Sequence, residues 1–136
     1  SQRNPKSQIL ISKQSQMDKS QNNKPYDLEE RTFKFAQRAI RYFKTLSRTI
    51  ANLEIAKQGI RSSGSVGSNF IEANEAFSRK DFLMRIKICR KEAKETIYWL
   101  RLSEPSDSQK AEQESLIKEA TELMKIFGSI IEKSKK

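Results

Sequence analysis

Apolar positions recur at intervals of three and four residues along most of this chain, which is the spacing of amphipathic helices. The pattern starts near Tyr26 and predicts a first helix with Asp27 as its N-cap. The signal weakens between Leu46 and Thr49, where we expect a short break with Ser47 or Thr49 capping the next helix, or a helix that runs on. A second helical pattern continues from there to Glu75.

Two more helices are expected in the second half of the chain. Ser78 is a suitable N-cap for a third helix that runs to Leu102, and Pro105 ends it. A fourth helix starts near Gln109. Short connections and the lack of strand-like alternation predict an all-α domain over residues 26–136, an antiparallel up-down-up-down four-helix bundle.

Each predicted helix has one apolar stripe, which we expect to face the core. In chain order, the stripes are Phe33, Ala36, Ile40, Phe43 and Ile50; Ile50, Leu53, Ile60, Gly67 and Ile71; Phe82, Ile86, Cys89, Ala93, Ile97 and Leu100; and Leu116, Ala120, Leu123, Phe127 and Ile130.

The second pattern crosses a stretch rich in Ser and Gly that has no charge between Arg61 and Glu72. Such a composition usually indicates a loop, but the apolar spacing continues through it without a proline, which favours helix. The GSVG run at Gly64–Gly67 matches the GxxG of KH loops in four letters only, without the strands that fold needs, and it lacks the lysine of a P-loop.

Small and polar residues occupy the side of this helix opposite Ile60, at three-four spacing. They are Ser62, Ser65, Asn69 and Glu72. A slim helix can approach a second neighbour closely, most simply another copy of the chain, so these residues are candidates for an oligomer or close helix contact. The alternative is a frayed, flexible helix. A hairpin turning near Phe77 would pair Glu72 with Arg85.

The chain of 136 residues carries 27 Lys and Arg against 17 Asp and Glu, a formal net charge of +10. This balance favours nucleic acid as a partner, although solubility alone is the plainer explanation. Residues 1–25 are rich in Ser, Gln, Asn and Lys and predict a flexible basic arm, whose short apolar run Ile9–Ile11 is a possible docking segment.

Several kinds of chemistry are disfavoured by composition. The chain has no histidine and one cysteine, Cys89, which excludes the usual Cys/His zinc sites and His-based triads. Glu72 has no second carboxylate or nucleophile at matching spacing. We therefore expect no enzyme activity, cofactor or metal. Neither an apolar run of about 20 residues nor a signal peptide is present, which predicts a cytoplasmic protein without membrane contact.

Two helices carry basic residues at three-four spacing, and these are the candidate nucleic-acid contacts. They are Arg31, Lys34, Arg38, Arg41 and Arg48 from the first helix, and Lys80, Lys87, Lys91, Lys94 and Arg101 from the third. Without exposed amide side chains to read bases, such stripes give affinity without sequence preference. Tyr98 and Trp99 can stack on bases, though at this spacing Trp99 is more typical of a core residue.

The segment from Ser62 to Leu102 resembles the four-helix-bundle family of 23S ribosomal RNA intervening-sequence proteins. The similarity lies in the Ser62, Ser65, Asn69 and Glu72 run before a short turn, followed by Phe82 and by Glu95 near ETIYWL. It covers the chain from about Tyr26 onwards. Two departures are Glu72-Ala73, where the family often has Glu-Gly, and Lys91-Glu92, where it often has Gly-Ser.

This resemblance implies a homopentamer of four-helix bundles, in a family with no established enzyme activity. Some members are encoded within inserts of ribosomal RNA genes. Related accessory proteins of diversity-generating retroelements are basic pentamers that bind a reverse transcriptase and nucleic acid. The sequence thus predicts a non-enzymatic homo-oligomer that binds RNA or DNA, and the alternative is a protein-interaction scaffold for a reverse-transcriptase-like or other nucleic-acid enzyme.

Overall fold

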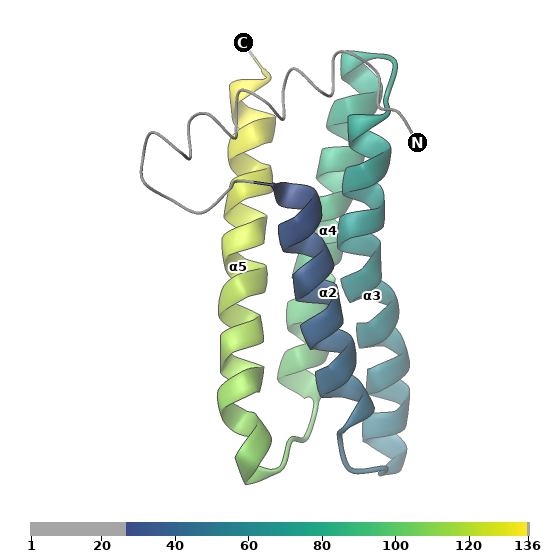
Figure 1. Cartoon of the computed structure of the whole chain (residues 1–136), viewed down its shortest axis with the longest axis vertical. Coiled ribbons are helices and arrows are strands. Elements are labelled where there is room, and N and C mark those ends of the chain that lie inside the picture. Colours follow the sequence, from purple (N-terminus) through teal and green to yellow (C-terminus); the bar gives the residue numbers. More distant parts are fainter. Residues whose placement is uncertain (1–26, 136) are drawn as a thin grey trace.

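A computed structural model describes residues 27–135, which form four helices joined by short connections (Figure 1). The helices are α2 (Leu28–Lys44), α3 (Ile50–Asn74), α4 (Arg79–Leu102) and α5 (Lys110–Lys133), and a 3-10 turn, η1 (Asp107–Gln109), precedes α5. Successive helices run in opposite directions, and no strand occurs in the described range. The predicted all-α four-helix bundle is confirmed, whereas the arm predicted for residues 1–25 lies outside the described residues.

The helix starts follow the capping residues expected from the sequence. The Asp27 carboxylate accepts from the backbone N–H of Glu29 at 2.9 Å. The Thr49 hydroxyl accepts from the N–H of Asn52 at 3.0 Å, and the Ser78 hydroxyl accepts from that of Asp81 at 3.0 Å. Each side chain satisfies one of the N–H groups that a helix start leaves unpaired. The break predicted between Leu46 and Thr49 is also present.

Helix α3 runs without interruption through the Ser/Gly stretch, as the apolar spacing predicted. Its glycines have separate roles. At Gly59 an added Cβ would lie 2.2 Å from the ring of Phe43 in α2, and at Gly67 it would lie 2.9 Å from the hydroxyl of Thr32. Glycine at these two positions lets α2 and α3 approach closely.

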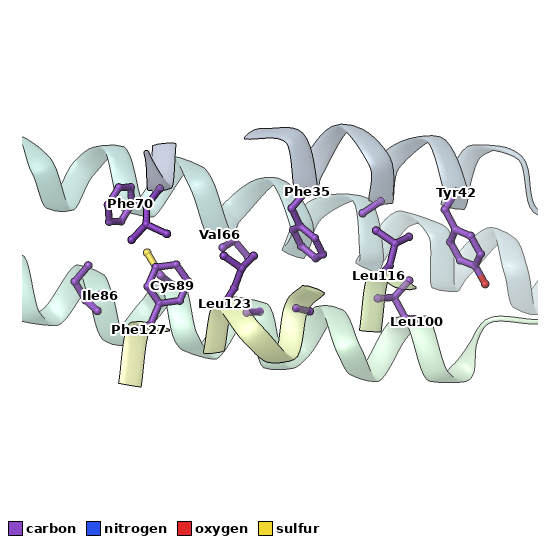
Figure 2. Packing of buried hydrophobic residues seen from close by; sticks show 14 of the residues in the cluster. Phe35, Tyr42, Val66, Phe70, Ile86, Cys89, Leu100, Leu116, Leu123 and Phe127 are labelled. Atoms are coloured by element: carbon purple, nitrogen blue, oxygen red, sulfur yellow. The ribbon is translucent and has the colours of Figure 1, made fainter. Parts of the chain in front are cut away.

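The core stripes predicted for α4 and α5 are largely confirmed. Ile86, Cys89, Ala93 and Leu100 of α4 are buried, as are Leu116, Ala120, Leu123 and Phe127 of α5 (Figure 2). Phe82, Ile97 and Ile130 are partly buried, and Ile131 fills the last core position of α5. Phe127 meets Phe70 of α3 with ring centroids 6.2 Å apart.

The stripes predicted for α2 and α3 are wrong at several positions, although Phe43 is buried as predicted and Ile60 packs partly against the core. Phe33 is 56% exposed, Ile71 49% and Ile50 86%. Besides Phe43, the buried positions are Leu28, Thr32, Phe35, Ala39 and Tyr42 in α2, and Asn52, Gly59, Ser62, Ser63, Val66, Phe70, Ala73 and Asn74 in α3. One reason is volume: the ring of Phe43 in α2 lies 2.2 Å from where a Cβ on Gly59 would be, so α3 has room only for a small residue there.

Buried polar side chains on α3 are hydrogen-bonded. Ser62 and Thr96 of α4 share a hydroxyl–hydroxyl bond of 2.8 Å. The amide nitrogen of Asn52 donates to the carbonyls of Ser47 and Glu104, and its oxygen accepts from the N–H of Glu104 at 3.0 Å. Asn52 therefore joins the α2–α3 connection to the start of the α4–α5 connection. Because its amide nitrogen and oxygen are both hydrogen-bonded, the side chain is buried without the cost of an unpaired polar group.

Candidate nucleic-acid interface

The outer surface of α4 carries a line of cations that we call the α4 basic face. It consists of Lys80, Lys87, Arg90, Lys91, Lys94 and Arg101, all exposed. The core residues of α4 lie on the other side of the helix, so the periodicity that buries Ile86 and Cys89 also turns these cations to solvent. At 1.5 Å per residue, the face extends over roughly 32 Å from Lys80 to Arg101.

Within residues 27–135, none of these six cations makes an ion pair or a side-chain hydrogen bond. The two nearby carboxylates of α4 are engaged elsewhere, because Arg61 of α3 pairs with Glu95 and, at 3.4 Å, with Glu92. Burial alone would raise the pKa of Glu95, but hydrogen bonds from Trp99 and Arg61 and the charge of Lys91 bring it below its usual value. Glu95 is therefore ionised but directed toward α3.

Arg90 was missing from the residues proposed on sequence grounds. It lies three residues after Lys87 and four before Lys94, so helical spacing was sufficient to include it.

The basic residues of α2 are placed differently, and the structure argues against that stripe as a phosphate-binding face. Arg31 makes two hydrogen bonds to Glu119 of α5, at 2.7 and 2.9 Å. Arg38 pairs in the same way with Glu112, at 3.1 and 2.9 Å, and this hydrogen bonding raises the pKa of Arg38. These two arginines close the α2–α5 seam.

The remaining basic residues predicted on α2 do not form a phosphate-binding face either. Lys34 lies 3.8 Å from Glu30 in an exposed pair. Arg41 and Arg48 are exposed, but Arg48 lies in the connection before α3. Helices α2 and α4 both pack against α3 and α5, so they lie diagonally across the bundle. The two predicted stripes therefore do not merge into one surface on a single chain.

An exposed aromatic residue interrupts the α4 basic face. Tyr98 is 55% exposed, and its ring meets that of Trp99 edge-on, with centroids 5.0 Å apart and planes at 72°. The Trp99 indole packs partly against the core, as its spacing suggested, and its Nε1 donates to Glu95 at 3.1 Å. Tyr98 is therefore available on the surface, whereas Trp99 is part of the packing between helices.

Two of the four residues predicted for a close contact on α3, Ser62 and Asn69, contact α4 within the chain. Ser62 is fully buried against α4 instead of lying opposite the core. The pairing of Glu72 with Arg85 is wrong: Glu72 is exposed, and Arg85 donates to the Asn69 amide oxygen at 2.9 Å. The antiparallel α3–α4 hairpin is present, but Arg85 lies opposite Asn69, about one helical turn before Glu72.

Ser65 is half-buried, and its hydroxyl donates to the Arg61 carbonyl at 2.9 Å. The outward side of α3 is instead defined by Ile50, Leu53, Gly64 and Ile71, which we call the α3 apolar face. Leu53 is 40% exposed, and nothing lies within 4 Å of a Cβ placed on Gly64. Apolar periodicity alone predicted that most of this face would lie in the core.

The fold and the α4 basic face define a small basic four-helix-bundle protein. A family model described as 23S rRNA-intervening sequence protein matches residues 24–129, so the chain belongs to that family. The resemblance drawn from the residues around Ser62–Glu72 is thereby confirmed.

A solved structure from Bacteroides thetaiotaomicron supports this assignment. It is described as a protein with unknown function from the S23 ribosomal protein family, and it shares 34% identity with this chain. The match has a TM-score of 0.67 and covers 77% of this chain and 98% of the other. Among curated proteins, none matches.

The described part of the chain contains no helix long and apolar enough to cross a membrane. Residues 27–135 also contain no cluster of three or more Cys, Asp or Glu side chains placed to hold a metal ion.

Proposed function

We propose that this protein is a non-enzymatic homo-oligomer that binds the phosphate backbone of RNA or DNA through the α4 basic face, with little base preference. The observation that supports this is the line of six exposed cations without ion pairs in the described structure. Lys and Arg give salt-dependent affinity for phosphates, whereas base choice requires groups that reach base edges.

The pattern of charges on α4 supports a polyanionic partner over mere solubility. Lys87 and Lys91, Arg90 and Lys94, and Lys91 and Lys94 are three or four residues apart, where like charges destabilise a helix. Elsewhere the chain offsets this repulsion, as with Arg31 and Arg38, which face carboxylates. A phosphate backbone along α4 would relieve the repulsion that the helix retains on its own.

The α3 apolar face supports the oligomeric part of the proposal. Exposed Leu53 and Ile71 flank a strip at Gly64 where a neighbouring backbone can approach. Contact between copies would cover these side chains and multiply the α4 basic face along one nucleic acid. The pentamer implied by the resemblance is the assembly we expect. The family's name, which refers to ribosomal RNA, agrees with an RNA partner.

A second candidate function is a protein-interaction scaffold, for example an accessory subunit of a reverse-transcriptase-like or other nucleic-acid enzyme. Phe77 favours it, because this side chain in the α3–α4 connection is 95% exposed and lies outside the α3 apolar face. Large exposed apolar side chains are typical of surfaces that meet another protein.

The main test is a titration of mixed-sequence RNA and DNA by fluorescence anisotropy at several salt concentrations. If about five phosphates are neutralised on duplex DNA, log K falls with a slope of roughly −4 to −5 against log salt. Replacing Lys87, Arg90, Lys91 and Lys94 with Gln is expected to flatten the slope by roughly 3 to 4.

The matched control changes four exposed lysines outside α4 to Gln, which lowers the net charge equally. These are Lys44, Lys110, Lys118 and Lys125. The control is expected to bind nearly as the unaltered protein does. Equal losses in both variants would assign binding to net charge, and no binding to either nucleic acid at about 50 mM salt would favour the scaffold.

Light scattering tests the assembly. The unaltered protein is expected to be oligomeric at tens of micromolar, and Ile71→Lys is expected to dissociate it while leaving its helicity. A monomeric unaltered protein would refute the oligomer.

A further inference from the structure

We infer that Tyr98 is a stacking platform for an unpaired base, so that the α4 basic face binds single-stranded nucleic acid in preference to a continuous duplex. This inference rests on the proposed function and specifies its substrate class. It concerns one side chain within the α4 basic face. The stacking role requires an unpaired base in the nucleic acid, whereas the cations require only phosphates.

The position of Tyr98 suits this role. It lies one helical turn after Lys94 and one before Arg101, so its ring is flanked by two unpaired cations along α4. Its exposed fraction is 55%, and its hydroxyl makes no hydrogen bond within residues 27–135. A base on this ring would have phosphates on either side within reach of Lys94 and Arg101.

The ring is supported from below. Trp99 contacts it edge-on, and Trp99 is itself fixed by its bond to Glu95, which pairs with Arg61 on α3. This series of contacts crosses from α4 to α3 and limits the orientations open to the exposed ring. A preorganised side chain loses less conformational entropy when a ligand binds.

Whether the nucleic acid is single-stranded or a duplex determines whether the Tyr98 ring can stack on a base. In a duplex, each base face is covered by its neighbours in the stack, and a side chain on a straight helix cannot reach it. In a single strand the base faces are accessible, and aromatic side chains stack on them with little sequence preference. The cations serve both substrates, whereas Tyr98 adds affinity for one.

The test compares binding of an unstructured U-rich RNA and a blunt duplex of the same length to full-length protein. Tyr98→Ala is expected to weaken single-strand binding by roughly 5- to 150-fold, the contribution of about one stacked base, with the salt slope and duplex affinity unchanged. Tyr98→Phe is expected to restore single-strand binding. Met84→Ala is the matched control, because Met84 is exposed on the same side of α4 without an aromatic ring.

A second measurement reports on the site directly. Trp99 is the only tryptophan in the chain and touches Tyr98, so its emission is expected to change with single-strand binding and much less with duplex binding. In Tyr98→Ala the change is expected to shrink. Unaltered circular dichroism would show that this variant is folded.

The outcomes separate this inference from the proposed function. Binding of both substrates that is insensitive to Tyr98→Ala, or weakened equally for both, would overturn the stacking role and leave phosphate binding intact. No binding of either substrate would overturn both.

Discussion

Gly59→Ala is expected to destabilise the bundle, although alanine is the better helix former. The Cβ of the new side chain would lie 2.2, 2.3 and 2.6 Å from three ring atoms of Phe43. Real Cβ atoms are not found that close to a neighbour, so the ring or the helix must move. Phe43 is only 2% exposed, which leaves the ring no solvent to move into.

Two effects of opposite sign determine the magnitude. Forcing extra volume into a packed core costs about 1–3 kcal/mol. Replacing glycine with alanine inside a helix returns about 0.5–1 kcal/mol. The two ranges leave a net cost of about 0–2.5 kcal/mol, and because the Cβ would lie within 2.6 Å of three ring atoms we expect the upper half of that range. Gly128→Ala in α5 is the control, because nothing lies within 4 Å of its Cβ position, and it should gain about 0.5–1 kcal/mol.

Urea unfolding followed by circular dichroism measures both changes, at one protein concentration because self-association contributes to apparent stability. In a Phe43→Leu background the ring atoms are gone, and Gly59→Ala should become neutral or stabilising. If Gly59→Ala gains stability as Gly128→Ala does, the close packing of Phe43 on α3 is refuted.

Two other predictions concern α4. Burial raises the pKa of the Cys89 thiol to about 12 from an ordinary 9.0, so its contribution to stability is present below pH 9 and is lost as the pH rises toward 12. Between pH 8 and 10 this loss lowers the free energy of unfolding by about 1.4 kcal/mol. Urea unfolding at the two pH values should show this decrease in the unaltered protein and a decrease smaller by that amount in Cys89→Ala. An identical decrease in both proteins would contradict the burial of the thiol. A double-mutant cycle should find coupling of about 0.5–1.5 kcal/mol between Asn69 and Arg85 and near zero between Glu72 and Arg85; the reverse would restore the register expected from the sequence.

The sequence predicted the number of helices and several of their ends because capping residues and proline act locally. Asp27, Thr49, Ser78 and Pro105 mark ends whatever the rest of the chain does. The core faces of α4 and α5 were also predictable, since Leu, Ile and Phe there follow one stripe with cations opposite.

The faces of α2 and α3 were not predictable from periodicity. A count of apolar positions treats Ile50 and Ile71 as core and Ser62 as surface, yet both isoleucines are exposed and Ser62 is buried against α4. That reversal depends on which residue of one helix meets which residue of the next, and spacing within a helix carries no such information. The α4 basic face was accessible to sequence analysis, whereas the neutralisation of Arg31 and Arg38 depends on α5, which is distant in sequence.

The two arginine–glutamate pairs at the α2–α5 seam also bear on how the bundle opens. Helix α2 is the shortest of the four, with 17 residues against 24 or 25. Partly exposed ion pairs contribute little to stability in water and are weakened by salt, whereas the α3–α4 hairpin is held by buried packing and hydroxyl bonds. Amide protons of α2 should therefore exchange through a partial opening in which α2 separates from α5 and its helical hydrogen bonds break, while α3 and α4 remain protected until the whole bundle unfolds.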